Sequence, residues 1–367
     1  MLKHFIEPDD MTEREYDDLF RLAQAIASDP GEYAHACDGK ILASLFFEPS
    51  TRTRMSFDAA MYRLGGQVLH LGDVKVSSMA KGETVRDTLH IVDQYADICA
   101  MRHPHAYTQH KAVDVLKNMP LINAGDGDHA HPTQTLADIF TIRKHKGAWS
   151  GLKIGFCGDL RYGRAVHSLF QFLNHYDNEF VFISPEGLNM PEEYLDTARC
   201  PYAEVDNLKA VIGDLDVLYM TRVQKERFIS EDEAKRYEGS YLLNAEVLNA
   251  ASDDLIVLHP LPRVDEIDAE IDSDPRALYF EQAQNGMYMR MALIMTLLEA
   301  KNEGDQQQGA GRGALRPHLG LRGRGVAGTI FHGKAPGPSE AFGPAHFDFF
   351  LKRRRPFLPY KKSRRRH

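Results

Sequence analysis

Short apolar runs alternate along this chain with longer segments whose apolar residues recur at helical spacing. In one such segment Phe57, Met61 and Leu64 share a helix face, and the pattern stops at the Gly-Gly pair that follows. Alternating strands and helices require parallel sheets that are covered on both faces. The predicted fold class is therefore α/β, with two doubly wound parallel-sheet domains and a ligand-binding crevice between them. The predicted strands form two sets, namely 41–47, 67–71, 98–103 and 120–125, followed by 153–158, 179–184, 216–221 and 255–260.

The distribution of charge divides the chain into two unlike segments. The formal net charge of the 367 residues is −8. Residues 301–367 hold 15 Lys and Arg against 4 Asp and Glu, whereas residues 1–300 hold 29 basic and 48 acidic residues. The second segment is rich in Gly, Pro and Arg, which is typical of disordered chain, so it is predicted to be a disordered basic tail. Such a tail could bind nucleic acid, but the acidic body opposes that binding and nucleic acid is not the favoured partner.

The cysteines and the apolar runs indicate the cellular compartment of the protein. The four cysteines, Cys37, Cys99, Cys157 and Cys200, are widely spaced and form no CxxC pair. This usage is typical of a reducing cytoplasm and disfavours a cysteine-based zinc site. No apolar run approaches the roughly 20 residues that span a bilayer, and the acidic N-terminus lacks a signal-peptide core. The protein is therefore predicted to be cytoplasmic, without a membrane partner.

The stretch EPSTRTR follows directly after the first predicted strand. A helix N-terminus presents unpaired backbone N–H groups and a partial positive charge. Ser50, Thr51 and Thr53 add hydroxyl donors, and Arg52 adds a planar fork that suits phosphate. The stretch therefore predicts a phosphate cradle that uses no glycine-rich loop. The alternative is an ordinary helix cap with two solvated arginines.

Polar side chains also follow the other predicted strands. Arg102 ends the third strand, where the alternative is a surface arginine. After the fourth strand, His131 precedes a helix and Gln134 lies one turn into it, so both are expected to face the crevice. Lys81 lies in a polar loop at 76–88 that could instead be an ordinary surface loop. Because ligands bind at the carboxyl ends of parallel strands, further candidates come from the second strand set, namely Arg164, Arg222, Gln224, Leu261 and Pro262.

Two other interpretations of these stretches were weighed. Asp126, Asp128, His129 and His131 are metal-ligand types, but their spacing fits neither an EF-hand loop nor a helical His pair. No metal site is therefore predicted. The stretch GFCGDLRYGR superficially resembles a dinucleotide fingerprint, yet its glycines do not match G-x-G-x-x-G, and Arg164 stands where a pyrophosphate would approach.

Seven motifs in order resemble the catalytic chains of the aspartate/ornithine carbamoyltransferase family. They are STRTR, SSMAKGE, MRHP, HPTQTL, GDLRYGR, MTRVQKER and HPLPRVDEI, and the resemblance covers roughly residues 1–300. Pro260 follows His259, where the ornithine enzymes typically carry a cysteine, which favours the aspartate branch. The resemblance implies a carbamoyl-phosphate-binding domain over 1–135, completed by a helix at about 286–300, and an aspartate-binding domain over 136–285.

The resemblance also implies a reaction. The carbamoyl group of carbamoyl phosphate is transferred to the amino group of L-aspartate, which gives N-carbamoyl-L-aspartate and phosphate in pyrimidine biosynthesis. The departing phosphate can take the proton of the attacking amine, so neither a covalent intermediate nor a cofactor is required. The alternatives are a carbamoyltransferase for another amino acid, such as ornithine, and an inactive structural homologue.

Roles follow from the same resemblance. The catalytic residues would be Arg52, Thr53, Arg102, His131 and Lys81. The residues that bind carbamoyl phosphate would be Ser50, Thr51, Arg52, Thr53, Arg102, His131 and Gln134, with the carbonyls of Leu261 and Pro262. The residues that bind aspartate would be Lys81, Arg164, Arg222 and Gln224, with either Ser77 or Ser78 beside the lysine.

Members of this family are homotrimers with shared active sites, in which the lysine loop comes from the adjacent chain. The resemblance therefore implies a homotrimer here. Some family members also bind zinc-containing regulatory chains and others bind dihydroorotase, and the sequence does not decide between these partners.

Overall fold

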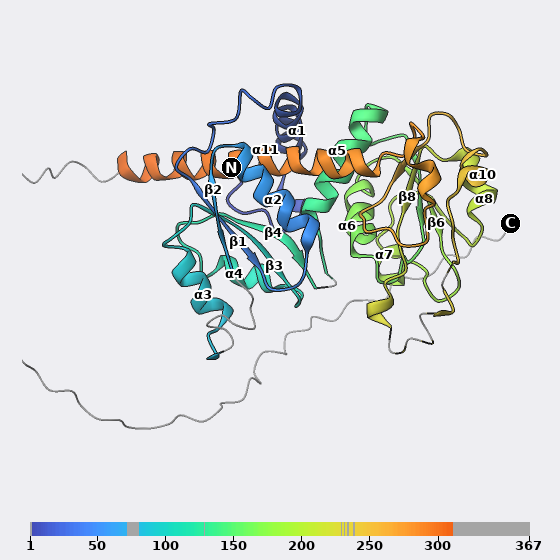
Figure 1. Cartoon of the computed structure of the whole chain (residues 1–367), viewed down its shortest axis with the longest axis horizontal. Coiled ribbons are helices and arrows are strands. Elements are labelled where there is room, and N and C mark those ends of the chain that lie inside the picture. Colours follow the sequence, from blue (N-terminus) through green and yellow to red (C-terminus); the bar gives the residue numbers. More distant parts are fainter. Residues whose placement is uncertain are drawn as a thin grey trace, which may run out of the picture. The chain divides into compact units, whose positions relative to one another are not determined.

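The computed structural model describes residues 2–71, 81–127, 129–228, 230, 232, 235–237 and 239–310, with residues 226 and 300–310 described by their backbone alone. Within these residues the chain forms two parallel β-sheets whose strands alternate with helices, which confirms the predicted α/β class (Figure 1). None of the helices in this part of the chain is both long and apolar enough to cross a membrane.

The first sheet has four strands in the order β2-β1-β3-β4. Its strand β1 pairs in parallel with both β2 and β3 and is buried over most of its length, as expected for a sheet that is covered on both faces. The elements of this part are η1 (Pro8–Asp10), α1 (Glu13–Ser28), β1 (Ile41–Phe46), α2 (Thr51–Arg63), β2 (Gln67–His70), α3 (Val85–Val92), β3 (Ile98–His103), α4 (Thr108–Val113), β4 (Leu121–Asp126) and α5 (Pro132–Lys146).

The second sheet has five strands in the order β7-β6-β5-β8-β9. Strand β7 was not predicted, because three of its four residues are exposed and it therefore lacks the apolar run that marks a buried strand. The elements are β5 (Lys153–Cys157), α6 (Arg164–Leu173), β6 (Glu179–Ile183), α7 (Glu192–Leu195), β7 (Tyr202–Val205), α8 (Leu208–Val211), η4 (Ile212–Asp214), β8 (Val217–Met220), η5 (Lys225–Arg227), α10 (Ala245–Leu248), β9 (Ile256–Leu258) and η6 (Ala269–Ser273).

All eight predicted strands are present, with bounds that agree to within two residues. The predicted ends run slightly long because the chain keeps its direction as it leaves the sheet. Phe47 follows β1, and its backbone N still donates to the carbonyl of Arg102 at 2.9 Å. The residues that carry the polar motifs therefore begin where the main-chain ladders end, at the carboxyl edge of each sheet.

Helix α11 (Tyr279–Ala310) returns the chain to the first sheet. Figure 1 shows this helix in orange, and it packs against α1, α2 and α5. The sequence predicted a shorter helix at about 286–300. The observed helix begins earlier, just after Ala277 pairs with Val257 of β9, and it continues ten residues beyond 300. The domain limits at 135 and 285 stay predictions.

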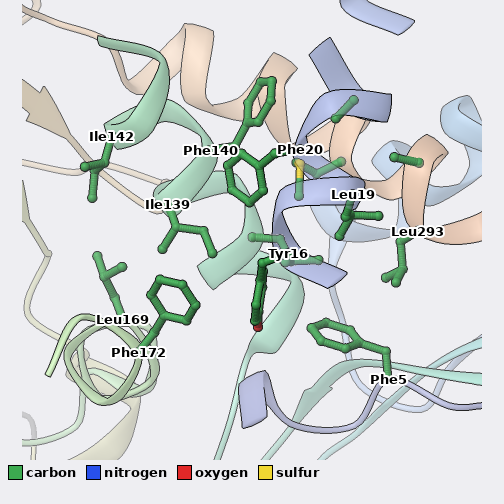
Figure 2. Packing of buried hydrophobic residues seen from close by; sticks show 14 of the residues in the cluster. Phe5, Tyr16, Leu19, Phe20, Ile139, Phe140, Ile142, Leu169, Phe172 and Leu293 are labelled. Carbon is green, nitrogen blue, oxygen red and sulfur yellow. The ribbon is translucent and has the colours of Figure 1, made fainter. Parts of the chain in front are cut away.

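A shared core of aromatic and aliphatic side chains joins α1, α5, α6 and α11 (Figure 2). The ring of Tyr16 on α1 lies 5.0 Å from that of Phe172 on α6, and the ring of Phe20 lies 5.2 Å from that of Phe140 on α5. Leu293 of α11 is fully buried in the same cluster. Because α5 packs into this core, the position of its N-terminus is fixed relative to both sheets.

Three predicted features lie outside the described residues. They are the serines Ser77 and Ser78 of the polar loop, Asp128 of the acidic and histidine cluster, and the tail beyond residue 310.

The packing of α11 gives a stability prediction. Leu293→Ala should lower the free energy of unfolding by about 2–5 kcal/mol, because it removes a fully buried side chain and leaves a cavity. Chemical denaturation followed by circular dichroism measures the change. Gln284→Ala, at an exposed position of the same helix, is the control and should change it by less than about 0.5 kcal/mol. A cost below about 1 kcal/mol at Leu293 would contradict a tight α11 interface.

Candidate active site

A crevice of about 770 Å³ lies at the carboxyl ends of the strands of both sheets. From the first sheet, it is lined by residues that follow β1, β3 and β4, and from the second by residues that follow β5, β8 and β9. Among the described residues, the lining includes every predicted site residue except Lys81: Ser50, Thr51, Arg52, Thr53, Arg102, His131, Gln134, Arg164, Arg222, Gln224, Leu261 and Pro262.

Three helices begin at this crevice. The N-cap residues of α2, α5 and α6 are Ser50, His131 and Gly163, and all three line it. Among the described residues, none of these three helix starts has a side-chain cap or an acidic residue in its first turn. By contrast, the side chains of Thr12 and Thr84 cap α1 and α3, which also carry acidic residues in their first turns. The uncapped backbone N–H groups therefore make the crevice a site for anions.

Arginine is the main charged residue of the crevice. Six arginines line it against one carboxylate, Glu48. Burial lowers the pKa of Arg164 and of Arg290 to about 10, so both guanidiniums remain charged at neutral pH. The arginines also act on one another, because Arg222 and Arg102 add to burial in lowering the pKa of Arg52. So much like charge favours an anionic ligand.

Glu48 connects two of these arginines across the crevice. Its Oε1 accepts a hydrogen bond from Nε of Arg102 at 2.6 Å and lies 3.4 Å from Nη2 of Arg164. Arg102 ends β3 of the first sheet, whereas Arg164 begins α6 after β5 of the second. One carboxylate thus orients a guanidinium from each side of the site.

The backbone carbonyl of Gly127 is a second acceptor for Arg164. It accepts from Nη1 of Arg164, and it also accepts from Nη2 of Arg227 at 3.3 Å. Gly127 has a φ of 55°, and a side chain there would lie 2.8 Å from the backbone N of Ala106. Glycine is therefore required for the tight turn that brings this carbonyl to the arginines.

His131 lies beside Arg102 on the floor of the crevice. Its Nε2 is 3.4 Å from Nη1 of Arg102, and its backbone N donates to Ser168 Oγ at 3.2 Å. Burial, followed by the charges of Arg102, Arg164 and Arg290, holds the pKa of His131 well below its usual value. The imidazole is therefore neutral at physiological pH. In the tautomer that carries its proton on Nε2, the imidazole and the guanidinium beside it can both donate to an oxygen on which negative charge develops.

The loop after β8 presents Arg222 and Gln224. The backbone N of Gln224 donates to Asp159 at 3.0 Å, and its side-chain amide donates to the carbonyl of Tyr162 at 2.5 Å. Both partners lie in the loop between β5 and α6, so this loop supports the loop after β8. Gly158, at the start of the supporting loop, has a φ of 123°, and a side chain there would lie 2.0 Å from the carbonyl of Thr221. The close approach of these two loops therefore explains this glycine without a bound dinucleotide.

The turn after β9 supplies backbone carbonyls. Leu261 has a φ of 52° and is followed by a cis peptide bond to Pro262. The backbone N of Leu261 donates to Nδ1 of His259 at 2.7 Å, and Nε2 of His259 faces Glu266 at 2.7 Å. This buried histidine thus holds the turn from within. Because proline has no N–H, the crevice side of the turn is rich in acceptors.

Lys81, Asp126 and His129 do not line the crevice in the described part of the chain. Lys81 is exposed and is not among the described lining residues. Asp126 accepts from the backbone N atoms of Tyr107 and Ala130 at 2.9 and 3.1 Å and also contacts His129, so it fixes the loop that leads to His131. Within the described ranges, no group of three or more His, Cys, Asp or Glu is placed to hold a metal ion.

The crevice also contains residues that sequence reasoning missed. Glu48 is the first residue of the stretch EPSTRTR and Arg227 lies within the motif MTRVQKER, so local sequence could have indicated both. Ser56 lies one turn beyond Thr53 on α2, so the same stretch could have indicated it too. The other three had no such signal, because they reach the crevice from α11, which is distant in sequence. The missed residues are Glu48, Ser56, Arg227, Tyr279, Gln282 and Arg290.

Comparison with known families matches almost the whole described part of the chain. Residues 3–144 match the model described as the carbamoyl-P binding domain of aspartate/ornithine carbamoyltransferase. Residues 150–297 match the Asp/Orn binding domain of the same family.

Individual relatives agree with this match. The aspartate carbamoyltransferase catalytic subunit of Lachnoclostridium phytofermentans is 54% identical over 302 residues, which cover 81% of this chain and 98% of that protein. The structure of the catalytic subunit of M. jannaschii aspartate transcarbamoylase is similar at a TM-score of 0.76 and 42% identity, covering 82% of this chain and 99% of that one. The Trypanosoma cruzi aspartate transcarbamoylase, in complex with carbamoyl phosphate and aspartate, gives a TM-score of 0.76 at 38% identity, covering 81% and 97%.

The uncapped start of α2 predicts stabilisation by inorganic phosphate. At a phosphate concentration about 100 times Kd, the melting temperature should rise by about 5–10 °C, because the anion binds the folded state only. Arg52→Ala should abolish most of this rise. Arg54→Ala is the matched control and should retain it, since Arg54 pairs with Asp58 at 3.9 Å and does not line the crevice. Thermal scans with and without phosphate measure the shift, and equal loss in both variants would show that the effect is general charge screening.

Proposed function

Because the chain belongs to the aspartate/ornithine carbamoyltransferase family, we propose that it transfers the carbamoyl group of carbamoyl phosphate to the amino group of L-aspartate. The products are N-carbamoyl-L-aspartate and phosphate. The observation that carries the proposal is the crevice itself, in which six arginines and three uncapped helix starts face one another with a single carboxylate. Two substrates that together bring a phosphate and two carboxylates match this excess of positive charge.

Carbamoyl phosphate binds at the first sheet in this proposal. Its phosphate lies at the start of α2, where Ser50, Thr51, Arg52 and Thr53 provide backbone and side-chain donors. Its carbonyl oxygen points to Thr53, Arg102 and His131. Donors at this place stabilise the charge of the tetrahedral transition state, and one such donor is commonly worth about 3–4 kcal/mol. The neutral state of His131 suits this role, because a neutral imidazole donates without adding a cation that must be desolvated.

The carbamoyl NH₂ group requires acceptors. Gln134 and the carbonyls of Leu261 and Pro262 line the crevice from α5 and from the turn after β9. They distinguish the NH₂ end of the carbamoyl group from its oxygen, so the group binds in one orientation.

L-Aspartate binds on the side of the second sheet. Arg164 and Arg222 each offer a planar fork, and Gln224 adds an amide. Glu48 keeps the fork of Arg164 directed into the crevice. Aspartate then presents its amine to the carbamoyl carbon, and the departing phosphate takes the amine proton. We assign the binding of carbamoyl phosphate to residues 1–135 with the later part of α11, and the binding of aspartate to residues 136–285.

A homotrimer with shared sites completes the proposal. Lys81 is exposed in the single chain, beyond the edge strand β2. Large exposed apolar residues lie on α2, β2 and α3 or just after α3, the elements on either side of Lys81 in the sequence, and a second copy could cover them: Met55, Tyr62, Leu69, Ile91 and Tyr95. A second chain that docks on this side would receive the Lys81 of the first chain in its own crevice, where a lysine would contact both substrates.

The reaction is tested directly with the full chain. Carbamoyl phosphate and L-aspartate should give N-carbamoyl-L-aspartate, measured by a colorimetric ureido assay or by mass spectrometry. L-Ornithine should react at least about tenfold more slowly, because the second arginine fork has no carboxylate to bind. A tenfold preference for ornithine would contradict the choice of amino acid, and no product with either would indicate an inactive homologue.

Subunit mixing tests the shared site. Arg52→Ala and Lys81→Ala should each be inactive alone, because each removes a cation from every site. After subunit exchange at equal amounts, about one quarter of the sites in random trimers carry both wild-type residues, so activity should recover to about that fraction. Exchange is followed by native mass spectrometry. If exchange is complete and activity stays absent, each site is built from a single chain.

A further inference from the structure

A buried carboxylate, Asp138, lies behind the crevice and binds the side chain of Gln134. Asp138 is fully buried on α5, one turn beyond Gln134. Its Oδ1 accepts from Nε2 of Gln134 at 2.7 Å and from Nε2 of Gln282 at 2.6 Å, and its Oδ2 accepts from the hydroxyl of Tyr219 at 3.0 Å. These partners come from α5, α11 and β8, so the carboxylate joins three elements.

The groups around Asp138 donate hydrogen bonds to it and so favour its ionised form. Burial raises the pKa of the carboxyl to about 7, while the hydrogen bonds from Gln282, Gln134 and Tyr219 and the charge of Arg290 act in the opposite direction. Three donors on one carboxyl group require it to act as an acceptor at every contact. At pH 8, above this pKa, the carboxylate is ionised and accepts at all three contacts.

The direction of these hydrogen bonds is set by the main chain. The backbone N–H of His259 can only donate, and it donates to Oε1 of Gln282 at 2.9 Å. The other end of the Gln282 amide is then Nε2, which must donate to Asp138. Asp138 in turn accepts from Nε2 of Gln134. The backbone donor therefore determines the orientation of both amides through a chain of buried contacts.

This chain of hydrogen bonds determines which end of the Gln134 amide faces the crevice. With Nε2 of Gln134 bound to Asp138, the end of the amide that remains for a ligand is the carbonyl oxygen Oε1. The same chain leads through His259 to the turn that carries the carbonyls of Leu261 and Pro262, since Nδ1 of His259 accepts from the backbone N of Leu261. One buried network thus supports every acceptor that faces the carbamoyl NH₂ group.

We propose that Asp138 is a positioning residue that fixes the Gln134 amide with its oxygen toward the crevice, and that it thereby makes the site selective for acyl phosphates that carry an NH₂ group. The proposal rests on the proposed function, in which Gln134 binds the carbamoyl nitrogen. Asp138 itself touches no substrate. It acts by preventing the reversed orientation of the Gln134 amide. In that orientation Nε2 would face the crevice, where its N–H groups would meet the N–H groups of the ligand.

The test compares two ligands that differ only at this nitrogen. Carbamoyl phosphate carries NH₂ where acetyl phosphate carries a methyl group. The measured ratio is the Kd of acetyl phosphate divided by the Kd of carbamoyl phosphate. Both constants are obtained by calorimetry on the intact protein at pH 8. A residue with a merely structural role would weaken both ligands together and leave the ratio unchanged.

The decisive comparison is between Asp138→Asn, which removes the carboxylate, and a double variant that also places a carboxylate at position 282. In Asp138→Asn the introduced amide should keep its oxygen toward both glutamines, because His259 still fixes Gln282, so the ratio should stay within about twofold of wild type. In the double variant D138N/Q282E the carboxylate at position 282 accepts from His259 and draws the NH₂ of the amide at position 138 toward itself. Gln134 must then turn its own NH₂ to the crevice. The ratio should fall at least about tenfold, the effect of losing one neutral hydrogen bond.

Controls separate this effect from loss of structure. Thr141→Val removes another buried hydrogen bond between α5 and α11, from Asn285 to Thr141 at 3.0 Å, and should lower the melting temperature without changing the ratio. If the double variant does not fold, Asp138→Ala, which frees the Gln134 amide to rotate, should still lower the ratio at least about twofold.

The outcomes distinguish the two proposals. A wild-type ratio in D138N/Q282E, or in Asp138→Ala where the double variant does not fold, overturns the role of Asp138 while the transferase function stands. A wild-type protein that shows no preference for carbamoyl phosphate and forms no N-carbamoyl-L-aspartate overturns the proposed function, and the inference with it.

Discussion

The excess of positive charge in the crevice is the constraint on which the other features of the site depend. Six guanidiniums meet where three helices begin, and like charges at such distances repel in a partly desolvated site. The chain tolerates them by fixing four of the six through neighbouring acceptors. Glu48 binds Arg102 and Arg164, the carbonyl of Gly127 binds Arg164 and Arg227, and Arg290 donates to Ser56 at 3.0 Å. These four guanidiniums are therefore held in place before any anion arrives, as electrostatic catalysis requires.

The two sheets contribute complementary halves of this arrangement. Residues after β1, β3 and β4 gather hydroxyls, an imidazole and guanidiniums, whereas those after β5, β8 and β9 supply guanidiniums, an amide and acceptor carbonyls. Helix α5 packs on α6 and α11 and holds His131 and Gln134 between the halves. The same aromatic core that stabilises α5, with Phe140 against Phe20, thus also sets the distance between the groups that contact the substrates.

A network of polar side chains extends from the lining of the crevice to the buried Asp138 behind it. Asp138, Gln282 and His259 form a network in which every contact has a defined donor, and it begins at a backbone N–H that cannot change its role. A network of this kind transmits a fixed polarity over several side chains without any charged group reaching the ligand. Selectivity for a carbamoyl group over an acyl group would then depend on Asp138, which the substrate does not touch.

The sequence by itself determined the α/β class, the positions of eight strands and most of the crevice, because the motif residues directly follow strands and parallel strands bring their carboxyl ends together. It could not indicate β7, whose exposed residues give no apolar run. Nor could it indicate Gln282 and Arg290, which reach the crevice only because α11 returns across the first sheet. Asp138 lies two residues beyond the motif HPTQTL, yet its hydrogen bonds to Tyr219 and Gln282 join residues 81 and 144 positions away. Only the tertiary structure decided these contacts, since a hydrogen bond between distant segments depends on packing that no local pattern records.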